Sequence, residues 1–124
     1  MSRVLPLPVV AACADRFAAL GAQPRLLILR MLLAAHPEGM NAGDLQKELD
    51  IPGSTLSHHL EKLKNEDLVT VRRDRQFLWY AANTEVLTGL IAFLYAECCS
   101  RTGAVKARTL GRLCCGWSGV EKLR

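Results

Sequence analysis

Apolar residues in the first third of the chain recur at the spacing of an α-helix. Over residues 9–20 they lie on roughly one face, and Gly21 is typical of a helix end. Pro24 favours the first turn of a second helix, expected to reach about Ala35, because its missing N–H would be unpaired there anyway. Pro37 and Gly39 then stop the pattern. The second helix is apolar over much of its circumference and is predicted to lie in the core; its apolar residues include Leu26, Leu27, Leu29 and Leu33.

Two shorter helices are predicted next, on either side of a turn. Asn41 is a favourable N-cap for a helix over residues 42–49, in which Asp44 complements the helix dipole. Residues 50–53 form the turn, and a fourth helix is expected over residues 54–68. Leu56, Leu60 and Leu63 give this helix an apolar stripe. Two short helices joined in this way match a helix-turn-helix, so residues 54–68 are predicted to face the major groove of DNA.

The pattern then changes from helical to β-type. Residues 68–72 and 77–80 are rich in β-branched, aromatic and apolar side chains around polar residues 73–76, which predicts a two-stranded hairpin, or wing. Its tip lacks Gly, so Asp74 is expected to adopt the positive φ. Asn83 or Thr84 is expected to cap a last helix that reaches about Cys99. Gly89 lies on the broad apolar face of that helix, where a partner backbone could approach closely.

These elements predict a mainly α fold with a small β-hairpin, a winged helix-turn-helix. Residues 1–99 are expected to form the DNA-binding and dimerisation domain, followed by a basic, Cys-containing tail over residues 100–124. A chain of 124 residues, half of them hydrophobic, has a modest core that a dimer sharing helices would help to stabilise. The net charge is +4, and residues from 100 onward contribute +5, so residues 1–99 carry −1. The basic tail is therefore either a solvated segment or a further DNA contact.

Composition also indicates the cellular compartment and excludes some classes of protein. The first ten residues lack the apolar block of a signal peptide, and the longest later apolar stretch, near residues 90–96, is too short to span a bilayer. We therefore expect a cytoplasmic protein with no membrane partner, in which five cysteines indicate metal, metalloid or redox chemistry rather than structural disulfides. No enzyme is expected, because His36, His58 and His59 have no recognisable nucleophile partnership and no phosphate loop or paired-carboxylate motif occurs.

The order of the elements resembles that of the ArsR/SmtB family of bacterial metal- and metalloid-responsive repressors. Residues 20–29 look like the family's opening block through Pro24, Arg25 and Leu26. Residues 57–63, with the pattern S-x-H-L-x-x-L, and the following Leu68-Val69 resemble its recognition block, except that Asp67 stands where members usually carry Gly. The resemblance covers about residues 17–99. It implies a homodimer, formed through the first and last helices, that represses a promoter on double-stranded operator DNA until an inducer binds.

Turning the three leucines of the fourth helix inward leaves a polar outer face. Hydroxyl, imidazole and ammonium groups are suitable donors to phosphates and base edges. The outer residues are Ser54, His58, Glu61 and Asn65, with Thr55 and Lys62 on one side and Ser57 and Lys64 on the other. The residues expected to contact DNA are Ser54, Thr55, Ser57, His58 and Lys62.

Two histidines and three wing arginines complete the expected interface. His58 points away from the leucines and is expected in the groove, whereas His59 borders them and is expected either half-buried or against a phosphate. Arg72, Arg73 and Arg75 are expected to touch a phosphate or the minor groove, the alternative being a solvated loop.

Two ligand sets known from the family are missing from this sequence. The helix over residues 42–49 lacks the C-x-C pair of the family's original arsenic site. The last helix offers Glu85 and Glu97 but no histidine, so the Asp/His pairs of the zinc-type members are absent. A hard or borderline divalent site is therefore poorly supported.

The candidate inducer ligands are cysteine thiolates: Cys98 and Cys99 at the end of the last helix, with Cys114 and Cys115 in the tail. Adjacent helical residues diverge by about 100°, so Cys98 and Cys99 are expected to share one atom only where the helix frays. The pair resembles that of an arsenic-responsive subset of the family, and the third ligand is Cys114, Cys115 or none, while Cys13 is expected to fill the core.

That resemblance implies no obligatory cofactor and an inducer that is As(III), Sb(III) or methylarsenite. A methylated arsenical would suit a site with only two thiolates. The alternatives are a redox or reactive-sulfur sensor, or a soft-metal (Cd²⁺ or Pb²⁺) sensor, of the same fold.

Overall fold

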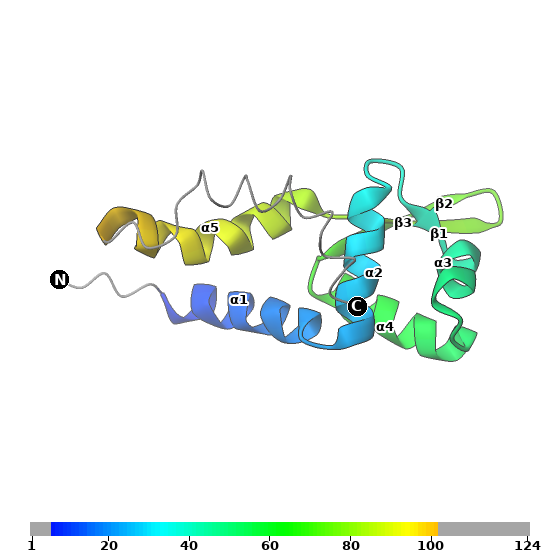
Figure 1. Ribbon diagram of the computed structural model, residues 1–124, viewed down its shortest axis with the longest axis horizontal. Coiled ribbons are helices and arrows are strands. Elements are labelled where there is room, and N and C mark those ends of the chain that lie inside the picture. Colours follow the sequence, from blue (N-terminus) through cyan, green and yellow to red (C-terminus); the bar gives the residue numbers. More distant parts are fainter. Residues whose placement is uncertain (1–5, 102–124) are drawn as a thin grey trace, which may run out of the picture. The chain divides into compact units, whose positions relative to one another are not determined.

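A computed structural model describes residues 6–101 of the protein, with side chains up to residue 96 (Figure 1). The chain divides into two compact units at Thr88, which are described one at a time. In chain order the elements are α1 (Leu7–Leu20), α2 (Gln23–Ala34), β1 (Met40–Asn41), α3 (Ala42–Leu49), α4 (Gly53–Asn65), β2 (Val69–Asp74), β3 (Phe77–Ala82) and α5 (Thr84–Arg101).

The core of the first unit lies between its helices and the inner face of its sheet. The predicted stripe of α4 is confirmed, because Leu56, Leu60 and Leu63 are all buried. The expectation that α2 is apolar core on most sides was wrong for Leu26 and Leu27, which are each 47% exposed. Only one face of α2 packs against α1, α4 and β3. The buried residues of that face are Ile28, Leu29 and Leu32.

Helix α4 ends at Asn65, three residues before the expected end at Leu68. The N–H of Leu68 donates to the carbonyl of Leu63 at 3.0 Å, and that of Asp67 donates to Lys64 at 2.9 Å. This pair of bonds is a Schellman motif, which requires a left-handed residue just beyond the helix. Asp67 takes that conformation with φ 60°, and Leu68 then turns inward and is fully buried.

The sheet has three strands in the order β1-β3-β2 rather than the two predicted. Strand β1 is two residues long and pairs Met40 with Tyr80, which is too short to leave a periodic signal in the sequence. Gly39 precedes it with φ +83°, and a Cβ there would collide with the carbonyl of Tyr80. The glycine therefore allows β1 to approach β3.

The turn between β2 and β3 is tighter than predicted. Asp74 pairs with Phe77 across the ladder, so the turn consists of Arg75 and Gln76. The positive φ of 62° falls on Arg75, and the expectation that Asp74 would carry it was wrong. Asp74 belongs to β2, where an extended backbone is required.

Helix α5 begins as predicted and continues past Cys99 to Arg101. The side chain of Asn83 accepts a hydrogen bond from the N–H of Val86 at 3.3 Å, which identifies Asn83 as its cap. In the second unit, Ile91 and Leu94 are 54% and 56% exposed. No single helix among residues 6–101 is long and apolar enough to cross a membrane; α1 and α2 meet the length and composition test only as a pair bent by 94°.

Two arginines join α4 to the helices that precede it in the first unit. The guanidinium of Arg16 donates to the carbonyl of Glu66 at 3.0 Å, at the end of α4. That of Arg25 donates to the carbonyl of Ala19 at 2.6 Å and lies 3.3 Å from Nδ1 of His59. Arginine has only donors, so Nδ1 accepts and the neutral ring carries its proton on Nε2. Burial, and then the charge of Arg25, lower the pKa of His59.

The His59 contact gives the protein a pH-dependent stability. The unfolded chain binds a proton at His59 near its ordinary pKa of 6.5, whereas the folded chain resists it until lower pH. The stabilisation is therefore complete above that pH and is lost as pH falls through the folded-state pKa. In urea denaturation between about pH 5 and 8, we expect the free energy of unfolding to fall more steeply on the acid side than in His59→Asn, which keeps an acceptor for Arg25. Identical pH profiles for the two proteins would contradict this assignment.

Candidate nucleic-acid interface

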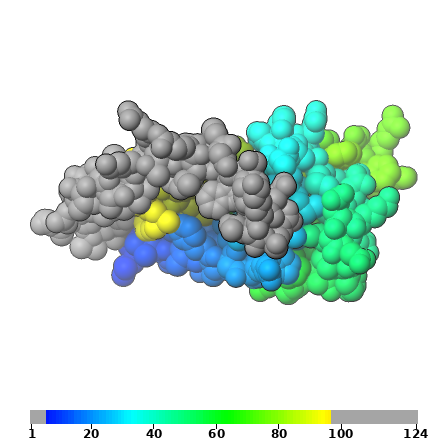
Figure 2. Space-filling model, in the orientation of Figure 1, coloured from blue at the N-terminus to red at the C-terminus, as the bar shows by residue number. Residues whose placement is uncertain are grey.

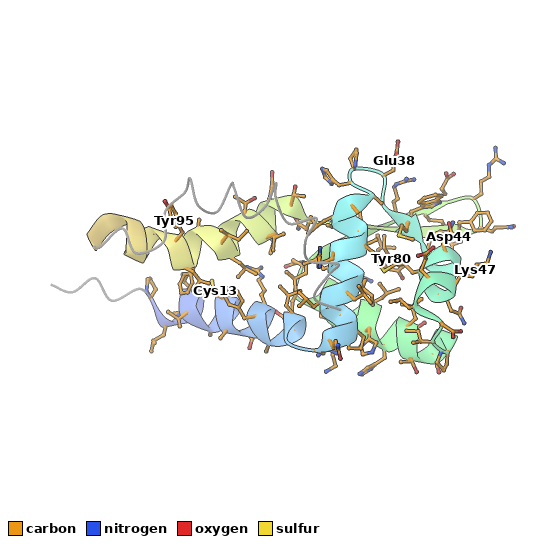
Figure 3. All side chains as sticks on the ribbon, in the orientation of Figure 1. Cys13, Glu38, Asp44, Lys47, Tyr80 and Tyr95 are labelled. Carbon is orange, nitrogen blue, oxygen red and sulfur yellow. The ribbon has the colours of Figure 1, made fainter. Side chains whose placement is uncertain are left out.

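The two helices of the predicted helix-turn-helix are held by local hydrogen bonds. The carbonyl of the Asn41 side chain accepts from the N–H of Asp44 at 2.8 Å, so the expected cap of α3 is confirmed. After α3, Asp50 is left-handed with φ 55°, and its N–H donates to the carbonyl of Gln46 at 2.8 Å. Pro52 in an extended conformation then starts α4 at Gly53, one residue earlier than predicted. Helix α3 carries Asp44 and Lys47 on its exposed side (Figure 3).

Helix α4 exposes the polar face that its leucine spacing predicts. Each predicted donor on this helix has an exposed side chain, as do Glu61 and Asn65 on the same outer face. The exposed donors are Ser54, Thr55, Ser57, His58 and Lys62. The structure therefore brings these five residues together on one continuous helix surface, opposite the buried leucines.

The two histidines of α4 have different surroundings. The side chain of His58 is exposed, and its ring centroid lies 5.9 Å from that of His59. The side chain of His59 is half-buried and contacts Arg25 through Nδ1. His58 can turn both nitrogens toward a ligand, whereas His59 has only its Nε2–H for that purpose.

The wing carries its three predicted arginines in two different situations. Arg73 and Arg75 are exposed toward the tip of the hairpin, which extends beyond the helices of the first unit (Figure 2). The guanidinium of Arg72 lies 5.3 Å from the centroid of the Trp79 ring and donates weakly, at 3.5 Å, to the carbonyl of Glu38. Arg72 thus links β2 to β3 through the ring of Trp79, and to the residue before Gly39 through the carbonyl of Glu38. Arg72 and Trp79 are opposite each other in the strand register, a pairing that the longer predicted turn over residues 73–76 did not give.

Tyr80 lies on the inner face of the sheet, between α2 and α3 (Figure 3). Burial, and then the charge of Glu61, raise the pKa of its phenol. The phenol therefore stays protonated at neutral pH. Glu61 exerts this charge from the exposed face of α4, whereas the predicted lysine, Lys62, lines a cavity together with residues of α1 and α2.

The predicted inducer ligands are not assembled within the described part of the chain. Cys98 and Cys99 have helical backbones in the last turn of α5, and their side chains lie outside the described residues, as do Cys114 and Cys115 entirely. Cys13 is buried in α1, in accord with a core role. Among the side chains that the structure describes, no group of three or more His, Cys, Asp or Glu residues could hold a metal ion.

Similarity to known proteins places the interface in a family. Residues 25–72 match a family described as a helix-turn-helix domain. The chain is 34% identical over 88 residues to the nodulation protein NolR of Rhizobium meliloti, covering 71% of this chain and 70% of NolR. It is 36% identical over 67 residues to the arsenical resistance operon repressor of Staphylococcus aureus, covering 54% and 62%. The solved structure of HlyU from Vibrio cholerae aligns with TM-score 0.57 at 32% identity, covering 70% of this chain and 95% of HlyU.

The matched residues build most of the interface, and Arg73 and Arg75 of the wing lie just beyond them. They run from α2 through both helices of the helix-turn-helix into β2, the first strand of the wing. The three-stranded antiparallel sheet and the helix order agree with the predicted winged helix-turn-helix. The relatives are transcriptional regulators rather than enzymes. The chain belongs to the ArsR/SmtB family of winged-helix transcriptional regulators.

Proposed function

We propose that this protein is a dimeric transcriptional repressor that releases operator DNA when its cysteine thiolates bind trivalent arsenic or antimony, inorganic or methylated. The observation that carries the DNA-binding part is the exposed polar face of α4, which is backed by three buried leucines. Such a helix can enter the major groove with its donors turned outward and its apolar side anchored in the protein.

The side chains of α4 and of the wing suit different parts of a DNA duplex. The hydroxyls of Ser54, Thr55 and Ser57 and the imidazole of His58 are short donors that reach base edges or the nearest phosphates. Arg73 and Arg75 extend from the hairpin and suit phosphates or a narrow minor groove beside the site. In this arrangement α4 supplies sequence discrimination and the wing supplies affinity.

Exposed apolar residues on the two predicted dimer helices support a homodimer. Leu7, Val9 and Val10 of α1 are 76%, 45% and 38% exposed. On α5, Ile91 and Leu94 are each more than half exposed. A monomer seldom leaves this much large apolar surface on two helices, and a second copy of the chain would cover it. Two copies would present two α4 helices to successive major grooves of a palindromic operator.

The proposed inducer rests on the paired cysteines. One relative is named for arsenical resistance, whereas NolR is named for nodulation and HlyU as an activator. In binding arsenite, each thiol replaces one hydroxyl of arsenous acid and releases a water. The backbone of α5 is helical through Arg101, and adjacent residues of an α-helix are about 100° apart around its axis. Binding of one arsenic atom by both would unwind the last turn of α5, or would recruit Cys114 or Cys115.

The same divergence favours a second candidate, a redox or reactive-sulfur sensor. Adjacent cysteines in an intact helix cannot pair with each other, but each can pair with a cysteine elsewhere. An oxidant would then link Cys98 or Cys99 to Cys114 or Cys115, and a thiol would reverse the link. Soft cations such as Cd²⁺ and Pb²⁺ would use the same thiolates.

The wing contact is tested with Arg75→Gly. This change removes a cation but suits the positive φ of that position, so we expect stability to rise by about 1 kcal/mol. On a duplex selected from a random pool by the wild-type protein, we expect weaker binding and a salt dependence whose slope falls by about one. Fluorescence anisotropy at several salt concentrations measures both, and Gln76→Ala, the other turn residue, is the matched control. Unchanged affinity and slope would exclude a wing contact at Arg75.

The inducer is tested by release of the same duplex in gel-shift assays. The probes are arsenite, methylarsenite, antimonite, Cd²⁺ and Zn²⁺ with a phosphine reductant, and polysulfide in a separate assay without it. We expect arsenite or methylarsenite to release the wild type and Cys13→Ala, but not the double variant Cys98→Ser/Cys99→Ser. Release of the double variant by arsenite would refute the site. Release by polysulfide alone, reversed by a thiol, would support the redox sensor instead.

A further inference from the structure

The recognition helix α4 is joined to α1 through the guanidinium groups of Arg16 and Arg25, whose hydrogen bonds go to the carbonyl of Glu66 and to the half-buried His59. We infer that these two arginines are positioning residues for DNA binding: they fix the angle at which α4 is presented. The inference rests on the proposed DNA-binding function of α4, and goes beyond it by naming what holds that helix in place.

Arg16 holds the C-terminal end of α4. Its Nε donates to the carbonyl of Glu66, the residue that caps this end and whose carbonyl has no partner within the helix. A cation at a helix C-terminus is also favoured by the helix dipole. The Nη2 atom lies 3.6 Å from a carboxylate oxygen of Asp67, but that side chain is 70% exposed, so the ion pair adds little. The hydrogen bond to the carbonyl is the stronger contact.

Arg25 holds the middle of α4. One edge of its guanidinium donates to the carbonyl of Ala19 in the last turn of α1, and Nη1 donates to His59 near the centre of α4. A planar guanidinium fixes both directions at once, which an ammonium group on a flexible chain does not. Arg25 itself belongs to α2, so this side chain ties three helices together.

An open cavity lies beside these contacts and reduces the packing between α1 and α4, which the contacts supplement. It has a volume of about 360 Å³ and is lined by Asp15 and Ala18 of α1, and by Lys62 and Asn65 of α4, among others. Close-packed side chains resist movement, whereas a cavity removes part of the packing between the helices that line it. Helices α1 and α4 also pack directly against each other, and beside the cavity the two arginines add hydrogen bonds to that packing.

Coupling between the dimer and the DNA follows from this arrangement. Helix α1 carries exposed apolar residues and is a proposed dimer helix, so a change in the dimer that moves α1 would move α4 with it. Loss of either arginine would leave α4 folded on its leucines but with a wider range of angles. Sequence-specific contacts depend on that angle, whereas non-specific attraction to phosphates depends on it far less.

The test compares Arg16→Gln and Arg25→Gln with the wild type on the selected duplex and on an unrelated duplex of equal length. Each variant is expected to bind the selected duplex about tenfold more weakly, while binding to the unrelated duplex stays within about twofold. Arg30→Gln removes the same charge from an exposed position of α2 and is expected to bind both duplexes like the wild type. Asp67→Gly, which removes the exposed ion pair and suits the positive φ of that position, is expected to do the same.

Two binding results would overturn the inference. An equal loss on both duplexes would mean that the arginines contact phosphates directly. Wild-type discrimination in both folded variants would mean that they serve stability alone. Arg25→Lys, which retains a cation and a donor, is expected to be better folded than Arg25→Gln yet to recover discrimination only in part, because its ammonium cannot span both acceptors.

A measurement without DNA separates this inference from the proposed function. Failure of the wild type to select any sequence would refute the DNA-binding function, and the placement of α4 can still be measured by hydrogen exchange. In Arg16→Gln the amides of Asp67 and Leu68 are expected to exchange faster than in the wild type, and in Arg30→Gln they are not. Equal exchange in all three proteins would show that Arg16 does not hold the end of α4.

Discussion

Burial of the three leucines of α4 is the interaction on which the interface depends. A helix of 13 residues is marginal in water by itself, so tertiary packing has to hold it. Each fully buried leucine contributes roughly 1.5–3 kcal/mol. Because Leu56, Leu60 and Leu63 share one face, the opposite face is left to solvent, and the hydroxyls, His58 and Lys62 are displayed there. The spacing of the three leucines thus both holds α4 on the protein and exposes its polar face to solvent.

The hairpin exposes its polar side chains in a different way. One of its arginines contacts other residues of the protein, and Arg73 and Arg75 are exposed. Arg72 is engaged with the ring of Trp79 and with the carbonyl of Glu38 beside β1. This contact stiffens the base of the wing, while Arg75 occupies a turn position that disfavours side chains. The positive φ of Arg75 is a local conformational cost at an exposed position of the turn.

The features predicted correctly from the sequence are those encoded locally. The leucine spacing predicted which face of α4 is buried, and Asn41 and Asn83 predicted two helix caps. Strand β1 escaped prediction because two residues carry no period. The contacts of Arg16 and Arg25 join residues 50 and 34 positions apart, and no local pattern encodes such pairs. The turn at Arg75 was misassigned because the strand register, rather than residue preference, selects which residue is left-handed.

Asp67 has a consequence for how this sequence can evolve. The Schellman motif at the end of α4 favours glycine, the residue without a side chain, at its left-handed position. Here a carboxylate stands at that position and lies beside Arg16, whose Nε also caps the helix. Because that ion pair is largely exposed while the hydrogen bond of Arg16 goes to the backbone of Glu66, position 67 can change to glycine without removing the need for Arg16. The end of α4 is thus closed partly by its own backbone and partly by a side chain of α1.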